Sequence, residues 1–233
     1  MPAIVASALY RRYGRRYALV DVTFEVAEGT VVMLAGRNGS GKSTLLRVLA
    51  TALRPDGGKA RVGGHDLLED AEAVRRHTAL LAHRANLYEP LTALENLALH
   101  ARLLGADASR AALVERLREV DLAERADDPV STFSAGMRQR LALSRVLLKD
   151  AKVVLLDEPY GHLDAPGFRL VDHLLESLRA KGRTVLMATH LLARGKALCD
   201  RALLLEAGRL AFAGPAGELR EDDADAPFAE GAA

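Results

Sequence analysis

Residues 31–44 read VVMLAGRNGSGKST, an apolar run followed by a glycine-rich loop. The run from Val31 to Ala35 predicts a strand that is buried on both faces. A helical pattern follows from Ser43 to Leu53 and ends before Pro55, Gly57 and Gly58. Residues 36–43 fit the pattern G-x-x-x-x-G-K-[ST] between this strand and this helix, which predicts a phosphate-binding loop.

The residue types in this loop suit a nucleotide phosphate. Glycines let successive backbone N–H groups turn inward around an anion, and the helix N-terminus adds partial positive charge. The Lys42 side chain can reach the β- and γ-phosphates, and the Ser43 hydroxyl is a hard oxygen ligand for Mg²⁺. The candidate phosphate-binding residues are Gly36, Arg37, Asn38, Gly39, Ser40, Gly41, Lys42, Ser43 and Thr44.

A second carboxylate site is expected at the end of another buried strand. Val153 to Leu156 is an apolar run, and Asp157 and Glu158 follow it directly. Ligands of open parallel sheets bind at the carboxyl ends of the strands. Asp157 would therefore hold Mg²⁺ directly or through water, and Glu158 would polarise an attacking water. Together with the loop, this pair predicts a nucleotide hydrolase.

The remaining strand signals lie at the two ends of the chain. Residues from Val20 to Val26 alternate between apolar and polar, which predicts a half-buried antiparallel strand. Further strands are predicted from Thr184 to Thr189 and from Arg201 to Ala213, the latter split into a hairpin at Ala207-Gly208. The sequence therefore predicts an α/β protein.

The middle of the chain is predicted to be helical. Thr92 and Glu95 form a capping box, and almost everything from 87 to 149 reads as helix or loop. Pro166 is placed at the first position of a later helix that runs to Ala180. Residues 216–233 are acidic and are predicted to be a disordered tail.

Charge and composition exclude several classes of protein. The 32 basic and 31 acidic residues give a formal charge of +1, so no nucleic-acid partner is expected. There is no apolar run of membrane-spanning length and no basic leader before the first apolar residues. The single cysteine, Cys199, excludes an internal disulfide and is expected to be a small buried residue. We expect a soluble cytosolic protein.

Motifs in the second half of the chain resemble those of one family. They are Phe133-Ser134-Ala135-Gly136-Met137, Arg138-Gln139-Arg140-Leu141-Ala142, Asp157-Glu158-Pro159, Leu163-Asp164 and Ala188-Thr189-His190. Over residues 1–215 the chain resembles the ATP-binding cassette of ABC transporters. The resemblance implies a P-loop NTPase (RecA-like) core of mostly parallel sheet with an N-terminal antiparallel β subdomain, formed by 1–86 and 150–215. It also implies an inserted α-helical subdomain, 87–149, that carries the signature motif.

The same resemblance implies ligands, partners and site residues. ATP and Mg²⁺ would be the cofactors. A transmembrane permease and a second cassette, in a homodimer or a heterodimer, would be the partners on the cytoplasmic face of the membrane. Tyr13 looks like the aromatic residue that stacks on adenine, and Ser134 and Gly136 like the contacts offered to the γ-phosphate of the second cassette. Asp164 would belong to the loop through which the two cassettes communicate. His190 would order the γ-phosphate and the water, beside catalytic Glu158 and Lys42.

The chain departs from the family pattern at two places. The signature usually reads Leu-Ser-Gly-Gly-Gln, and here Ala135 and Met137 replace Gly and Gln. His83 stands where the family has a glutamine that senses Mg²⁺ and the membrane partner. An imidazole can bind a water or a metal, so His83 is either a substitute for that glutamine or an ordinary loop residue.

These departures resemble one subfamily, the ATP-binding subunit of the haem exporter of cytochrome c maturation. The features are His83, the Ser134-Ala135-Gly136 core and Tyr160 after Asp-Glu-Pro. The alternative is the ATPase subunit of a multidrug, lipid-linked or antibiotic exporter. A soluble factor acting on ribosomes or DNA is disfavoured, because the chain holds one cassette and 87–149 is too short for a long coiled coil. The permease is expected to dock on Ala93 to Leu104 and on the loop around His83 to Pro90.

Overall fold

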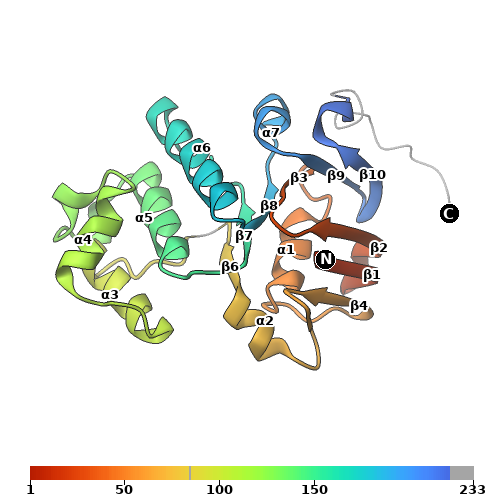
Figure 1. Cartoon of the computed structure of the whole chain (residues 1–233), viewed down its shortest axis with the longest axis horizontal. Coiled ribbons are helices and arrows are strands. Elements are labelled where there is room, and N and C mark those ends of the chain that lie inside the picture. Colours follow the sequence, from red (N-terminus) through yellow and green to blue (C-terminus); the bar gives the residue numbers. More distant parts are fainter. Residues whose placement is uncertain (84, 221–233) are drawn as a thin grey trace.

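The computed structural model describes residues 1–83 and 85–220, which form two β-sheets with helices around them (Figure 1). The smaller sheet is antiparallel and has the strand order β2-β1-β4-β5. Its strands are β1 (Pro2–Tyr13), β2 (Arg16–Ala27), β4 (Gly57–Val62) and β5 (His65–Asp66).

The larger sheet carries the motifs predicted to bind nucleotide. Its strand order is β10-β9-β3-β8-β7-β6, in which β9, β3, β8, β7 and β6 are parallel and β10 pairs antiparallel at one edge. The strands are β3 (Val31–Ala35), β6 (Thr78–Leu81), β7 (Val153–Asp157), β8 (Thr184–Ala188), β9 (Arg201–Glu206) and β10 (Arg209–Pro215). The mostly parallel sheet, the separate antiparallel sheet and the β9–β10 hairpin are as predicted.

Helices cover the larger sheet and form a unit at one end of the molecule. The α-helices are α1 (Lys42–Leu49), α2 (Ala71–His77), α3 (Ala93–Leu104), α4 (Arg110–Arg118), α5 (Ala135–Leu147), α6 (Ala165–Ala180) and α7 (Leu192–Leu198). Short 3-10 helices occur at η1 (Ala123–Arg125), η2 (Val130–Thr132) and η3 (Ala216–Glu218). Within residues 1–83 and 85–220, none of the helices combines the length and the apolarity that crossing a bilayer requires.

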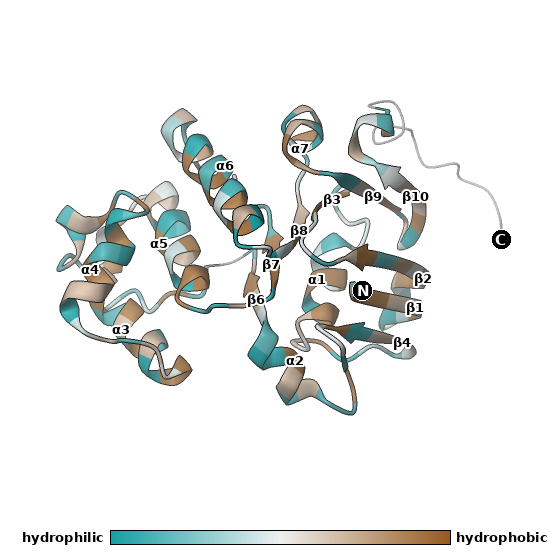
Figure 2. Cartoon of the chain, viewed as in Figure 1, coloured by the Kyte–Doolittle hydropathy of each residue, from teal (hydrophilic) through white to brown (hydrophobic). Residues whose placement is uncertain are grey.

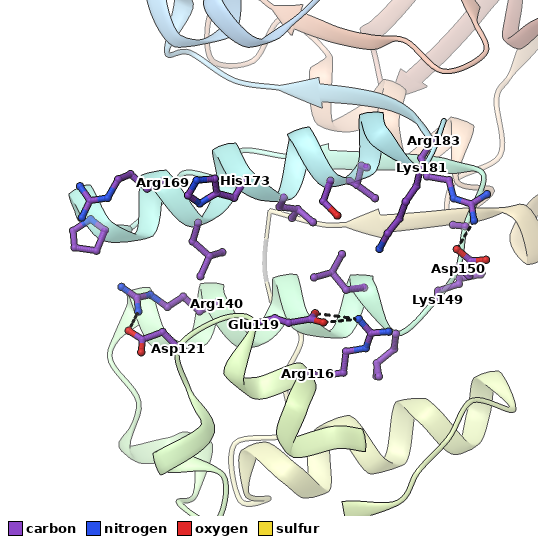
Figure 3. Close-up of a pocket in the computed structure, with 18 residues that line it drawn as sticks. Arg116, Glu119, Asp121, Arg140, Lys149, Asp150, Arg169, His173, Lys181 and Arg183 are labelled. Carbon is purple, nitrogen blue, oxygen red and sulfur yellow. Dashed lines mark hydrogen bonds and ion pairs between the residues drawn. The ribbon is translucent and has the colours of Figure 1, made fainter. Parts of the chain in front are cut away.

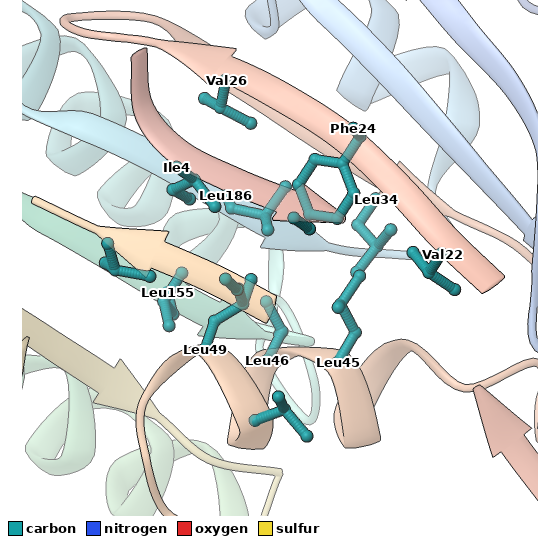
Figure 4. Packing of buried hydrophobic residues seen from close by; sticks show 14 of the residues in the cluster. Ile4, Val22, Phe24, Val26, Leu34, Leu45, Leu46, Leu49, Leu155 and Leu186 are labelled. Carbon is teal, nitrogen blue, oxygen red and sulfur yellow. The ribbon is translucent and has the colours of Figure 1, made fainter. Parts of the chain in front are cut away.

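The main core forms where α1 packs between the two sheets (Figure 4). Leu45, Leu46 and Leu49 of α1 and Leu34 of β3 are fully buried, and Phe24 of β2 is buried beside them. Burying a leucine or phenylalanine side chain contributes about 1.5–3 kcal/mol each. This packing holds the N-terminus of α1, and therefore the phosphate loop before it, against the end of β3.

A separate apolar cluster holds α3, α4 and the first half of α5 together. Figure 2 shows apolar residues on these helices interleaved with hydrophilic ones, as expected for amphipathic helices packed into a small unit. Helix α5 belongs to two clusters, because Leu141 packs against α3 and α4 while Leu143 and Val146 pack beneath the larger sheet. Helix α5 therefore joins the helical unit to the core.

The predicted capping box is present at the start of α3. Thr92 Oγ1 accepts a hydrogen bond from the Glu95 N–H at 3.1 Å, and the Thr92 N–H donates to Glu95 Oε2 at 2.8 Å. Gly105 ends the helix in the left-handed region at φ 67°. The local sequence therefore determines both ends of this helix.

The structure corrects three expectations. The helix predicted from Ser43 to Leu53 ends at Leu49, because Thr51 adopts a positive φ of 58° that breaks the helical path. Ala216 and Leu219 are buried in the core, so the predicted disordered tail does not begin at 216. The rest of that prediction, 221–233, lies outside the described residues. Pro166 is the second residue of α6, one position later than predicted.

The sequence predicts an N-terminal antiparallel β subdomain but does not delimit strand β1, and the geometry of β1 explains why. Its pairing with β2 shifts register between Ala6 and Leu9, and Ala8 has a positive φ of 49°. An irregularity of this kind interrupts the two-residue alternation by which a strand is recognised in a sequence.

Replacing Gly41 with alanine is expected to lower the free energy of unfolding by about 2–4 kcal/mol. Gly41 has a φ of +112°, and a Cβ there would lie 2.4 Å from the Ala18 carbonyl oxygen, so a side chain adds a collision to backbone strain. Urea denaturation without nucleotide measures the change. Gly105→Ala is the matched control, because its φ is +67° and nothing lies within 4 Å of the added Cβ. The control isolates the backbone cost of about 1 kcal/mol, and an equal loss in both variants would contradict the prediction.

Candidate functional site

A cavity of about 470 Å³ opens where the phosphate loop, the end of β7 and the end of β1 meet. Its lining residues are Tyr13, Arg16, Ala18, Asn38, Gly39, Gly41, Lys42, Ser43, Thr44, His83, Asp157 and Glu158. Most of the residues predicted from separate motifs therefore line one space at the carboxyl ends of parallel strands, as ligand sites of such sheets do.

The phosphate loop folds tightly around its own backbone. A Cβ on Gly36 would lie 2.3 Å from the Leu205 carbonyl oxygen, so only glycine fits there. Lys42 is 6% exposed, and its ammonium donates hydrogen bonds to the carbonyl oxygens of Gly36, at 2.5 Å, and Arg37, at 3.1 Å. Burial lowers the pKa of Lys42, and the nearby carboxylates of Glu158 and Asp157 oppose that shift. The lysine thus sits within the loop, close to two carboxylates.

Two buried oxygens beside Lys42 have no hydrogen-bond partner among the described residues. They are Ser40 Oγ and Asp157 Oδ1, and the two residues are 1% and 3% exposed. A buried polar oxygen without a partner is costly unless a ligand completes it. Asp157 Oδ1 and the Ser43 hydroxyl are hard oxygens on the same cavity, a donor set that fits Mg²⁺.

Glu158 and His190 lie next to each other although 32 positions separate them. Glu158 Oε2 is 2.9 Å from His190 Nδ1, and the Glu158 N–H donates to the Ala188 carbonyl oxygen at 2.9 Å. The Glu158 side chain is 15% exposed and lines the cavity, whereas that of His190 is 67% exposed and open to solvent. Glu158 has a φ of 52°, a strained conformation that costs about 1–3 kcal/mol and commonly occurs at functional sites.

Gln139 is a residue at this site that sequence reasoning did not select. Its Nε2 donates to the carbonyl oxygens of Glu158, at 3.2 Å, and Pro159, at 3.1 Å, and the residue is 8% exposed. The bonds tie α5 to the loop that follows β7. The motif around Gln139 was visible in the sequence, but its partners are backbone atoms 19 and 20 residues away, which no local pattern indicates.

Tyr13, His83 and Arg16 form the outer part of the cavity. Tyr13 is 46% exposed and lines it, whereas Tyr10 and Tyr17 do not. His83 also lines it, which agrees with the ligand-facing alternative for that residue more than with an ordinary loop position. Arg16, which sequence reasoning missed, lies over the loop, with Nη2 3.5 Å from the position of a Cβ on Gly39.

Seven predicted residues do not line this cavity. Gly36, Arg37 and Ser40 belong to the phosphate loop itself, and His190 contacts Glu158 of the cavity wall. The other three, Ser134, Gly136 and Asp164, lie elsewhere. Ser134 caps α5 by accepting from the Met137 N–H at 3.2 Å, and Asp164 caps α6 by accepting from the Gly167 N–H at 3.0 Å. The bond from Gly167 lowers the pKa of Asp164. A Cβ on Gly136 would lie 2.9 Å from the His162 carbonyl oxygen, so the start of α5 packs on the loop before Asp164. Ser134, Gly136 and Asp164 thus form a second group, away from the phosphate loop.

A larger cavity of about 710 Å³ lies between α5 and α6 and contains none of the predicted site residues (Figure 3). Each carboxylate that lines it is already paired with an arginine. The ion pairs are Arg116–Glu119 at 2.9 Å, Arg140–Asp121 at 2.8 Å and Arg183–Asp150 at 2.5 Å. This cavity therefore lacks the unpaired buried oxygens that distinguish the site at the phosphate loop.

Comparison with known proteins agrees with this geometry. A family model described as ABC transporter matches residues 19–161, more than half of the chain. The daunorubicin resistance ATP-binding protein DrrA3 of Streptomyces coeruleorubidus is 42% identical over 222 residues, which cover 94% of this chain and 70% of that protein. The Nod factor export ATP-binding protein I of Paraburkholderia xenovorans (strain LB400) is 35% identical over 209 residues, which cover 89% of this chain and 69% of that protein.

Solved structures share the fold. One is a dimeric ATP-binding cassette in a post-hydrolysis state, bound to ADP and Pi. It superimposes with a TM-score of 0.83 at 26% identity and covers 91% of this chain and 98% of its own.

Proposed function

Because the chain belongs to the ABC transporter family and is an ATP-hydrolysing cassette of that family, we propose that it powers the export of an amphiphilic small molecule through a transmembrane permease. The observation that carries this proposal is the 42% identity, over 94% of the chain, with a daunorubicin resistance ATP-binding protein. This proposal corresponds to the alternative that the sequence offers, the ATPase subunit of a multidrug, lipid-linked or antibiotic exporter.

Haem export, the first assignment from the sequence, receives less support. The relatives described above are named for daunorubicin resistance and Nod factor export. The features that suggested haem export, His83 and Tyr160 among them, belong to the nucleotide side of the protein. His83 lines the nucleotide cavity and Tyr160 is buried, so we expect neither to contact cargo or to discriminate between exporters.

The hydrolytic site would be completed by a second copy or a second cassette. Ser134, Gly136 and Asp164 lie apart from the phosphate loop of their own chain. In a head-to-tail pair, Ser134 and Gly136 of one chain would contact the γ-phosphate held by the loop of the other. The N-cap position of Ser134 supports this role, because an anion is stabilised by a helix N-terminus.

The residues of the cavity have distinct roles in this proposal. Tyr13 would stack on the adenine ring, and the loop N–H groups with Lys42 would hold the phosphates. Ser43 and Asp157, which share the cavity with His83, would hold Mg²⁺, and the ion would supply positive charge beside the phosphates. Glu158 would accept a proton from the attacking water. His190, whose Nδ1 lies 2.9 Å from the Glu158 carboxylate, would order the γ-phosphate and this water.

Glu158→Gln is expected to lower kcat for ATP hydrolysis by about 10²–10⁴-fold, because an amide cannot accept the proton. Its KM for ATP should change little, since Gln keeps the shape of the side chain. A phosphate-release assay on the purified chain measures both values. Chelation by EDTA is a control that should stop turnover by the unchanged protein. Turnover near the original rate in Glu158→Gln would rule out Glu158 as the base.

We place the permease contact on the helical unit, 87–149. Leu103 and Leu104 at the end of α3 are 74% and 42% exposed, and Tyr88 in the preceding loop is 53% exposed. Asn96, fully buried, fastens this loop to α3 by accepting from the Tyr88 N–H at 2.9 Å and donating to its carbonyl oxygen at 3.0 Å. Large exposed apolar side chains on a rigid element suit a protein–protein contact.

Leu103→Asp is expected to reduce recovery of the permease with the tagged chain by at least about tenfold, because a charge would be desolvated at the contact. Quantitative mass spectrometry after purification in mild detergent measures the recovery. Leu68→Asp is the matched control, since Leu68 is 48% exposed and lies between β5 and α2. Equal recovery with both variants would place the contact elsewhere.

Drug export predicts that daunorubicin raises the ATPase rate of the chain reconstituted with its co-purified permease by at least about twofold, because cargo binding favours closure of the cassettes. Haem is the comparison cargo in the same proteoliposomes, and the Glu158→Gln protein gives the background. Stimulation of the ATPase rate by haem and not by daunorubicin would favour haem export over drug export.

A further inference from the structure

Four side chains from three segments meet in a group that joins α6, α7 and the loop after β7. Tyr160 follows β7, Phe168 and Asp172 lie on α6, and Arg194 lies on α7. The Tyr160 hydroxyl donates to Asp172 Oδ1 at 2.8 Å, and Arg194 Nη1 forms an ion pair with the other oxygen of the same carboxylate. We call this group the Arg194 cluster.

The rings of the Arg194 cluster add cation–π contacts. The Arg194 guanidinium carbon lies 5.5 Å from the centre of the Tyr160 ring and 5.0 Å from that of Phe168. The two rings meet edge to face, with centroids 5.3 Å apart. Arg194 thus bonds to one side chain and covers two others.

The side chains of the Arg194 cluster are partly or fully shielded from water, which limits the arrangements that they can adopt. Tyr160 is 3% exposed, and the side chains of Arg194 and Asp172 are 35% and 22% exposed. Burial and the bond to Asp172 raise the pKa of Tyr160, so its hydroxyl remains a donor. A buried hydroxyl and a half-buried ion pair that share one carboxylate allow few alternative arrangements.

Two residues of the Arg194 cluster are close in the chain to Glu158 and His190. Tyr160 comes two residues after Glu158, and Arg194 comes four residues after His190, which is about one helical turn. On its other side, α7 packs so closely on β3 that a Cβ on Gly195 would lie 2.1 Å from Met33 Sδ. Helix α7 is therefore held between β3 and the Arg194 cluster.

We propose that Arg194 is a positioning residue, which through Tyr160 and Asp172 holds the His190 imidazole against the Glu158 carboxylate. This inference rests on the roles proposed above for Glu158 and His190. The His190 side chain is 67% exposed, and among the residues that the structure describes its polar contact is the Glu158 carboxylate, so the path of α7 sets where the ring lies. The Arg194 cluster fixes that path relative to the loop after β7.

A positioning role predicts a kinetic signature that a stabilising role does not. Arg194→Ala should lower kcat for ATP hydrolysis by about 10–100-fold, because small misplacement of catalytic groups is costly. The KM for ATP should stay within about twofold, since none of the cluster residues lines the nucleotide cavity. Arg194→Lys should recover little of the loss, because an ammonium lacks the planar fork that pairs and stacks.

Arg179→Ala is the matched control. Arg179 also ties α6 to the end of α7, through the Leu198 carbonyl oxygen at 2.7 Å and Asp200 at 2.9 Å, but at the far end of the helix from His190. The Arg179→Ala variant should melt at a lower temperature than the unchanged protein, as Arg194→Ala should, but its kcat should be unchanged. Tyr160→Phe, which removes a single hydroxyl, is the milder second variant if Arg194→Ala does not fold, and it should lower kcat with KM unchanged.

The deciding experiment adds His190→Ala to each variant of the whole purified chain. If Arg194 acts through His190, the double variant should be within about threefold of His190→Ala alone, because the two losses are not independent. Full additivity of the losses, or a kcat for Arg194→Ala equal to that of Arg179→Ala, would overturn the inference alone. Normal turnover by His190→Ala would overturn the proposed role of His190 and this inference together.

Discussion

The parallel register of three central strands is the constraint on which the site depends. Leu34 of β3 and Asp157 of β7 both pair with Ala188 of β8, so the three strands end level with one another. The phosphate loop, the Asp157-Glu158 pair and His190 each follow one of these strand ends. Because backbone hydrogen bonds set this register, the three motifs meet at one edge whatever the loops beyond them do.

The site is built from polar groups that the fold alone does not satisfy. Lys42 is buried on backbone carbonyls, and Ser40 Oγ and Asp157 Oδ1 lack partners among the described residues. Such groups are unfavourable for folding but ready for a charged ligand, since a nucleotide phosphate or a cation would complete them. The packing of α1 between the two sheets supplies the stability that makes this arrangement possible.

Helix α5 connects the nucleotide site to the part of the protein proposed to contact the permease. Its first half packs with α3 and α4, its second half packs beneath the larger sheet, and Gln139 holds the carbonyl oxygen of Glu158. The Arg194 cluster fixes the other side of the same loop through Tyr160. Movement of the helical unit would therefore reach Glu158 through direct contacts and not through solvent.

The sequence by itself determined the phosphate loop, the strand before it, the Asp157-Glu158 pair, the β9–β10 hairpin and the capping box of α3. Each of these is a local pattern, because a periodicity or a cap reports the burial and bonding of neighbouring residues. Only the tertiary structure decided that His83 and Arg16 line the cavity, and that Ser134 and Asp164 lie apart from it. It also decided that Gln139 and Arg194 contact the segment that follows β7. These partners lie far apart in the chain or are backbone atoms, and strand β1 contains an irregularity, so no sequence period marks them.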